Sequence, residues 1–285
     1  MKRAAGILLH ISSLPGPYGI GTLGEAAYRY VDFLAAAGIA YWQVLPLCPL
    51  GSSNSPYSSI SLFANSELYI DPEQLAAEGY LKEEELPALR YKGDSSRSDY
   101  DFARKNSAHY LRRAFSRMSE EQHREMLAFV NAESSWLSDY ALYTVLHEQY
   151  KRRSWQEWPE AYARHDEKAL ADFSLEHVDA LEYVYFCQWQ FRRQWDRLKN
   201  YAHERKVKII GDMPIFPALD SADVWAAPEQ FQLDEAGYPL AVAGVPPDYF
   251  SEDGQLWGNP LYDWEYSEKD GYNWWIERMR YAMAL

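Results

Sequence analysis

The segments AAGILL (residues 4–9) and YWQVL (residues 41–45) decide the fold, because each is a short apolar run of the kind that forms a buried strand. Residues 24–37 lie between them and repeat apolar side chains at helical spacing. A strand, a helix and a second strand in this order predict a parallel β-α-β unit. Continuous apolar strands are typical of a parallel sheet that is covered on both faces. The fold class is therefore α/β.

The helix over residues 24–37 carries its own start and stop signals. Val31 and Leu34 recur at the spacing of one helix face. We expect Thr22 and Glu25 to form a capping box at its start and Gly38 to end it.

The rest of the chain alternates between loops and helices. Residues 46–72 hold too many turn-forming residues for regular structure and predict a long loop after the second strand. Residues 73–205 predict helices, and residues 207–212 predict a third strand that finishes on Asp212. The helices therefore form an insertion between strands two and three. We divide the chain into residues 1–72, 73–205 and 206–285, the last with the third strand, a loop and a final helix.

Several helices in the last two segments can be placed from sequence. Ser119 and Gln122 predict a capping box, and helices are expected near residues 134–150 and 175–202. A last helix is expected over residues 272–285, with Trp275, Met279 and Met283 at helical spacing.

Charge and composition exclude several classes of partner. The formal charge of −14 and the pI near 5.0 disfavour nucleic acid, since the surface repels phosphate. No apolar stretch reaches about 18 residues, so we expect no membrane span. Cys48 and Cys187 lack metal-ligand spacing and are expected to be reduced packing residues. The start resembles a signal peptide, but we interpret it as a first strand and expect a cytoplasmic protein.

Aromatic residues make up 16% of the chain, with 11 Trp and 23 Tyr. Rings with a polar edge suit sugar binding, because the apolar face of a sugar stacks on them while its hydroxyls bond to their polar tips. The alternative, for most single rings, is ordinary core packing.

Six unusual segments, in order, carry a resemblance to a known family. They are HISSLPGPYGIGTLG (residues 10–24), YWQVLPL (41–47), SPYSSISLFANSELYID (55–71), IIGDMPIF (209–216), DSADVWA (220–226) and VAGVPPDYFSEDGQLWGNPLYDW (242–264). These segments resemble glycoside hydrolase family 77, the 4-alpha-glucanotransferases or amylomaltases. The resemblance reaches both ends of the chain and is weak only in the helical insertion.

The resemblance implies the N-terminal part of a TIM (β/α)8 barrel and a retaining double displacement that transfers alpha-1,4-glucan segments to glucose or maltooligosaccharide acceptors. Such chemistry needs two carboxylates, a nucleophile and an acid/base. In the family these follow the fourth and fifth strands, which we expect beyond residue 285. Asp263 and Glu265 do not match them and are expected to be solvated in a loop. Only three of eight strands can be placed, so we expect the barrel to be incomplete here.

The residues that can be carried over bind substrate. By resemblance, Asp212 touches the donor sugar, while Ser55 and Tyr57 belong to the loop beside the scissile bond. The alternatives are a helix cap or ion pair for Asp212 and a core ring for Tyr57.

A further set matches a mobile loop that lies over bound glucan in the family, with Gly244, Gly254 and Gly258 as expected hinges. Packing is the alternative for Phe250 and Trp257, and holding of the loop backbone is the alternative for Asn259. The set comprises Asp248, Tyr249, Phe250, Gln255, Trp257 and Asn259.

Two positions carry less certain roles. His10 ends the first strand, where a structural histidine with satisfied hydrogen bonds is expected over a binding residue. Pro217 stands where the family usually has an aliphatic residue, which puts the roles of Asp220 and Asp223 in doubt.

Three function classes compete at this point. The first is a glucanotransferase fragment that needs the C-terminal half of the same enzyme as its partner and binds maltooligosaccharides and alpha-1,4-glucans. The second is a non-catalytic alpha-glucan-binding module. The third, a metal-dependent barrel enzyme, is disfavoured because no His/Asp/Glu cluster has ligand spacing. We expect no cofactor and no metal.

Overall fold

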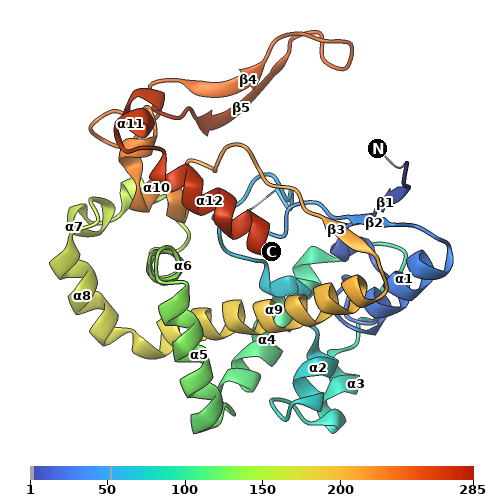
Figure 1. Cartoon of the computed structure of the whole chain (residues 1–285). Coiled ribbons are helices and arrows are strands. Elements are labelled where there is room, and N and C mark those ends of the chain that lie inside the picture. Colours follow the sequence, from blue (N-terminus) through green and yellow to red (C-terminus); the bar gives the residue numbers. More distant parts are fainter. Residues whose placement is uncertain (1–2, 52) are drawn as a thin grey trace.

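The structure is a computed structural model that describes residues 3–51 and 53–285 (Figure 1). Three strands, β1 (Gly6–Leu8), β2 (Tyr41–Gln43) and β3 (Lys208–Ile210), form one parallel sheet in the order β1-β2-β3. Gly6 lies opposite Tyr41, which in turn lies opposite Lys208. The predicted parallel β-α-β unit and third strand are therefore confirmed, but β3 ends at Ile210 rather than at Asp212 as predicted.

One helix connects β1 to β2, helices make up most of the chain between β2 and β3, and further helices follow β3. They are α1 (Glu25–Ala36), α2 (Pro72–Ala77), α3 (Leu86–Leu89), α4 (Tyr100–Phe115), α5 (Glu120–Ala132), α6 (Leu137–Gln149), α7 (Glu160–Ala163), α8 (Glu167–Glu176), α9 (Val178–Glu204), α10 (Ala222–Ala226), α11 (Trp264–Lys269) and α12 (Asn273–Ala284). Since α2 to α9 all lie between β2 and β3 along the chain, the predicted position of the helices is confirmed.

One of the two predicted capping boxes is wrong. Gly24 is the N-cap of α1, without a side-chain cap. The hydroxyl of Thr22 instead donates to the buried carboxylate of Asp71 over 2.6 Å. Asp71 approaches so closely that a Cβ atom at position 24 would lie 2.1 Å from its Oδ2. The second box is present, because the side chains of Ser119 and Gln122 exchange hydrogen bonds with each other's backbone N–H at the start of α5.

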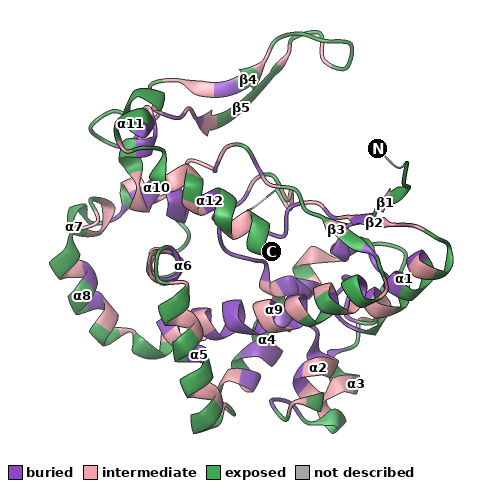
Figure 2. Ribbon diagram, in the orientation of Figure 1, coloured by how far each residue is buried: buried purple, intermediate pink, exposed green. Residues whose placement is uncertain are grey.

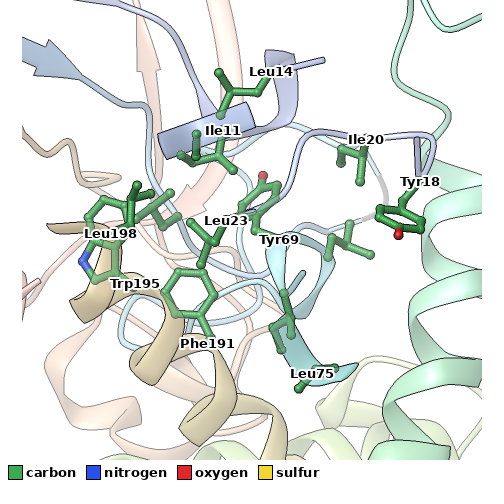
Figure 3. Packing of buried hydrophobic residues seen from close by; sticks show 14 of the residues in the cluster. Ile11, Leu14, Tyr18, Ile20, Leu23, Tyr69, Leu75, Phe191, Trp195 and Leu198 are labelled. Atoms are coloured by element: carbon green, nitrogen blue, oxygen red, sulfur yellow. The ribbon is translucent and has the colours of Figure 1, made fainter. Parts of the chain in front are cut away.

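The helix α9 joins two buried cores. Phe191, Trp195 and Leu198 pack with residues of the first loop and of α2, as the close view shows (Figure 3). Nearer its start, Leu181 and Val184 pack into a second cluster with α6 and α10. Figure 2 shows buried residues along much of α9, which runs across the molecule between the two groups of elements.

The small sheet is covered incompletely. Trp42 on the central strand is fully buried, whereas Leu8 and Ile210 on the outer strands are 52% and 43% exposed. Burial of apolar surface is the main favourable term in folding, so exposed aliphatic side chains beside a parallel sheet mark a surface that could be covered further.

A two-stranded hairpin projects from the other end of the molecule (Figure 1). Its strands, β4 (Val242–Val245) and β5 (Gln255–Pro260), are antiparallel. Gly254, just before β5, has φ of 73°, and a Cβ atom there would lie 2.4 Å from the carbonyl oxygen of Val245. Only glycine fits this close, left-handed turn.

One prediction near the end of the chain needs correction, whereas the predicted last helix is present as α12. Asp263 and Glu265 do not lie in a loop: Asp263 caps α11 by accepting the N–H of Tyr266, and Glu265 is in the first turn. On α12, Met279 and Met283 are 46% and 83% exposed, while Arg278 is 1% exposed. The aromatic residues that this helix meets lie on its Arg278 side.

Two further expectations concern the chain as a whole. Cys48 and Cys187 are free and buried, which confirms their predicted packing role. Within residues 3–51 and 53–285, no helix combines the length and the apolar character that crossing a bilayer requires.

Candidate functional site

The site is built on Asp212, which lies two residues beyond the end of β3. Active sites of parallel α/β folds form at the carboxyl ends of strands. The hydroxyl of Tyr57, from the loop after β2, donates to Asp212 Oδ2 over 2.6 Å, and the N–H of Met213 donates to Oδ1 over 2.8 Å. Both oxygens of the carboxylate are thus oriented. The structure brings together the two residues that the sequence proposed from different strands.

The loop that carries Tyr57 is held at its far end by two glutamines of α9. Gln188 accepts the N–H of Asn65 over 2.8 Å and donates to its carbonyl over 2.9 Å. Gln194 does the same to Asp71, over 2.7 and 3.1 Å. Each glutamine side-chain amide therefore bonds both the N–H and the carbonyl of one loop residue, as a neighbouring strand would. These backbone groups would otherwise be buried without a hydrogen-bond partner.

Tyr57 is accessible and electrostatically coupled to Asp212. Its side chain is 46% exposed. The hydrogen bond to Asp212 raises the pKa of Tyr57 to about 12, and burial and the negative charge of Asp212 act in the same direction. Ser55 shapes the turn beneath the ring, since its hydroxyl accepts the N–H of Tyr57 over 3.3 Å. A neutral phenol beside an oriented carboxylate offers both a stacking face and hydrogen-bonding groups.

The turn of the hairpin presents aromatic rings to solvent. Tyr249 is 98% exposed, Phe250 is 89% exposed, and their rings meet edge to face. Asp248 holds this turn by accepting the N–H groups of Phe250 and Ser251 over 2.8 and 2.9 Å. These rings are not core residues, so packing as the alternative for Phe250 is excluded.

Trp257 lies on β5 and is 49% exposed. Its indole N–H donates to the side-chain oxygen of Gln255 over 3.1 Å. Among the described residues, no hydrogen bond joins Trp257 or the turn residues to Tyr57 or Asp212. By their hydrogen bonds, the predicted residues form two groups, a strand-end pair (Tyr57 and Asp212) and a hairpin group.

Asn259 connects these two groups. Its amide donates to the carbonyl of Pro217 over 2.7 Å. It therefore holds backbone, as one of the two interpretations expected, and the backbone it holds belongs to the segment that follows Asp212.

Asp220 and Asp223 serve as anchors for neighbouring segments. Asp220 accepts the hydroxyl of Tyr143 over 2.8 Å and lies 3.1 Å from His147 Nε2. Burial alone would raise the pKa of Asp220, but the hydrogen bonds from His147 and Tyr143 lower it below its usual value. Asp223 is buried and accepts the N–H of Leu62 over 2.8 Å. Burial raises the pKa of Asp223 to about 6, against the opposing effects of Leu62 and Arg278.

His10 is buried beside the sheet and away from solvent. Its Nε2 lies 2.9 Å from the hydroxyl of Tyr69, while Nδ1 has no partner in the part of the chain that the structure describes. Burial lowers the pKa of His10 to about 4. The predicted structural histidine is thus buried as expected, with only one of its two nitrogens bonded.

The described residues contain no group of three or more His, Cys, Asp or Glu side chains placed to hold a metal ion. The carboxylates near Asp212 are directed instead to backbone N–H groups, tyrosine and histidine.

Sequence reasoning missed the residues that support the site from behind. Gln188 and Gln194 are buried polar residues of α9, and Arg278 is a buried cation of α12. The sequence feature that could have indicated a buried polar residue is a polar side chain among the aromatic residues of a helix, as in the run WWIERM (residues 274–279). Periodicity alone assigns such residues to solvent.

Comparison with known proteins now identifies the family. A family model described as 4-alpha-glucanotransferase, of glycoside hydrolase family 77, matches residues 9–285. The 4-alpha-glucanotransferase of Aquifex aeolicus is 45% identical over 285 residues, covering 99% of this chain and 57% of the relative. That of Thermus thermophilus is also 45% identical, covering 100% of this chain and 57% of the relative.

A solved structure agrees. The amylomaltase from Streptococcus agalactiae in complex with acarbose superposes with a TM-score of 0.94 at 39% identity, over 98% of this chain and 57% of that one. The fold is therefore that of an α/β protein related to 4-alpha-glucanotransferases. The chain belongs to the 4-alpha-glucanotransferases of glycoside hydrolase family 77. It spans a little more than half the length of these relatives.

Proposed function

We propose that this chain binds alpha-1,4-glucans at a surface centred on Tyr57 and Asp212, as part of a 4-alpha-glucanotransferase. The observation that carries the proposal is the 2.6 Å hydrogen bond between these two residues at the carboxyl end of β3. It places an accessible ring and an oriented carboxylate side by side, and these are the groups that a sugar with one apolar face and several hydroxyls requires.

Each group has a distinct role in this proposal. The ring of Tyr57 stacks on a glucose unit, and the Asp212 carboxylate accepts hydrogen bonds from its hydroxyls. Ser55 fixes the turn that sets the ring. Charge-assisted hydrogen bonds to hydroxyls are stronger than neutral ones, so Asp212 contributes most of the polar affinity.

The hairpin group covers the bound glucan. Tyr249, Phe250 and Trp257 supply apolar surface, Asp248 fixes the backbone of the turn that carries Phe250, and Gln255 accepts the indole N–H of Trp257. A cover of this kind excludes water, so an acceptor glucan rather than water receives the transferred segment. The complex of the Streptococcus agalactiae relative with acarbose supports a carbohydrate ligand for this fold.

The bond-breaking step belongs to a longer enzyme in this proposal. Asp263 and Glu265 sit at the start of α11, where Asp263 accepts the N–H of Tyr266 as the helix cap, and we assign them no part in the bond-breaking step. We infer that the nucleophile and the acid/base lie on barrel strands that follow β3, and that those strands cover Leu8 and Ile210, which are exposed here. Two free cysteines suit a reducing compartment such as the cytoplasm.

Product analysis with maltotriose tests the proposal that this chain binds glucan but does not carry the residues that break the glycosidic bond. The 285-residue chain should release no glucose and form no longer dextrins, whereas a chain extended to the length of its relatives should do both. Binding should be present in each. Disproportionation by the 285 residues alone would refute the proposed location of the chemistry.

A further inference from the structure

The segment between β3 and α10, which begins with Asp212, is held by side chains from much later in the chain. The hydroxyl of Tyr262 donates to the carbonyl of Ile215 over 2.7 Å. Arg278 donates through Nη1 to the same carbonyl and to the Tyr262 oxygen, both over 3.1 Å. Figure 1 shows α12, which carries Arg278, alongside this segment.

The contact is enclosed by aromatic rings. Tyr262 stacks on Phe216, the residue after Ile215, with ring centroids 5.6 Å apart. The Arg278 guanidinium lies 4.9 Å from the centroid of Trp275. With Asn259 on Pro217, the backbone carbonyls at positions 215 and 217 are both bonded from the β5 and α12 side.

The burial of Arg278 is costly for a residue that serves stability alone. The side chain is 1% exposed, and Nε and Nη2 have no partner among the described residues. No carboxylate in the described part of the chain lies within ion-pair distance of it. Burial lowers the pKa of Arg278, although the guanidinium stays charged in proteins. An apolar residue of similar volume often stabilises such a site as well or better.

We propose that Arg278 is a positioning residue for glucan binding, which sets the location of Asp212 by holding the Ile215 carbonyl together with Tyr262. The inference rests on the proposed function. It adds that the strand-end site and the base of the hairpin are one mechanical unit. Asp212 meets a sugar hydroxyl only while the segment that follows it is held at Ile215.

The first test separates positioning from stability. Arg278→Met removes the charge and the hydrogen bonds while keeping volume, so the thermal midpoint should stay unchanged or rise. Maltooligosaccharide affinity, measured by calorimetry, should fall by about tenfold, the effect of one lost charge-assisted hydrogen bond. Arg280→Met is the matched control, because Arg280 lies on the same helix, is exposed and pairs with Glu277. It should bind like the wild type.

The second test asks whether Arg278 acts through Asp212. In an Asp212→Asn background, Arg278→Met should lower the maltooligosaccharide affinity by less than about twofold, because the side chain at position 212 that is being positioned has already lost its charge. An equal tenfold loss in both backgrounds would overturn the proposal. Wild-type affinity in Arg278→Met would overturn it as well.

The third test needs no ligand. Hydrogen exchange of the peptide over residues 212–217 should be faster in Arg278→Met than in the wild type and in Arg280→Met, at equal global stability. If the wild-type chain binds no glucan, the proposed function fails. The exchange experiment still decides whether Arg278 and Tyr262 hold the segment at Ile215, a contact that we call the clamp. Unchanged exchange rejects the clamp. Should Arg278→Met not fold, Arg278→Lys and Tyr262→Phe take its place in all three tests.

Discussion

The hydroxyl of Tyr57 donates to the carboxylate of Asp212 over 2.6 Å, although 155 residues separate them in the chain. The helices from α2 to α9 fill that interval and bring the two loops to the same edge of the sheet. The longest of these helices, α9, holds the loop that supplies the ring, through the side chains of Gln188 and Gln194.

Tyr57→Phe should weaken maltooligosaccharide binding by about two- to twelvefold, which is the effect of about 0.5–1.5 kcal/mol for one hydrogen bond. The ring remains for stacking, so binding should not vanish. Calorimetric titration measures the change. Tyr238→Phe is the control, since Tyr238 is 50% exposed on another loop and should behave as wild type. Equal effects of the two substitutions would exclude a special role for the Tyr57 hydroxyl.

Trp257→Ala should reduce glucan affinity about tenfold, because a stacking ring of the cover is lost. The free energy of unfolding should change by less than about 0.5 kcal/mol, since Trp257 is half-exposed. Intrinsic fluorescence titration with maltooligosaccharides provides the readout. Trp264 is 54% exposed but stacks on Trp275, so Trp264→Ala should keep the ligand response. A full response in Trp257→Ala would remove Trp257 from the site.

Asp223 should make the free energy of unfolding fall as pH rises. Burial raises the pKa of Asp223 to about 6, whereas an unfolded aspartate titrates near 4. The folded chain therefore binds the proton more tightly, and this stabilisation is complete below about pH 4 and is lost as pH rises through 6. The total is about 3 kcal/mol.

The neutral variant Asp223→Asn lacks that titration. Its unfolding free energy relative to wild type, from urea denaturation, should increase steadily between pH 4 and pH 7. A difference that stays constant over this range would show that Asp223 does not titrate in the folded state as expected.

His10 should have the opposite pH dependence. Burial lowers the pKa of His10 to about 4, below the value near 6.5 expected in the unfolded chain. The contribution of neutral His10 to the free energy of unfolding is therefore fully present above pH 6.5. It is lost as pH falls toward 4, and the loss amounts to about 3 kcal/mol. His10→Gln keeps a donor for Tyr69 and should remove this loss. Parallel denaturation profiles of the two proteins from pH 7 to pH 4 would contradict the prediction.

Local periodicity predicted the parallel sheet and the main helices but not the hairpin of β4 and β5, whose residues were expected to form a loop. The apolar runs around Ile7, Trp42 and Ile209 predicted the three parallel strands, because continuous apolar residues are typical of strands in a parallel sheet. The capping box of Ser119 was equally predictable, since both of its partners lie within one helical turn. The capping box predicted for Thr22 was wrong because the Thr22 hydroxyl donates instead to the carboxylate of Asp71, which is distant in sequence.

The parts of the site that depend on long-range polar contacts could not be predicted from pattern. Arg278 sits in an aromatic helix segment, and charge alone would place it in solvent. Its position depends on the carbonyl of Ile215, which no local rule can locate. The role of Asn259 was left between two interpretations for the same reason, until its bond to Pro217 decided it.

Titration calorimetry of the 285-residue chain with a linear maltooligosaccharide, beside Asp212→Asn, tests the central claim most directly. We predict saturable binding by the wild type and an at least tenfold weaker affinity in the variant, with both proteins equally folded. No binding by the folded wild type, or equal affinity of the two proteins, would contradict a glucan-binding surface centred on Tyr57 and Asp212.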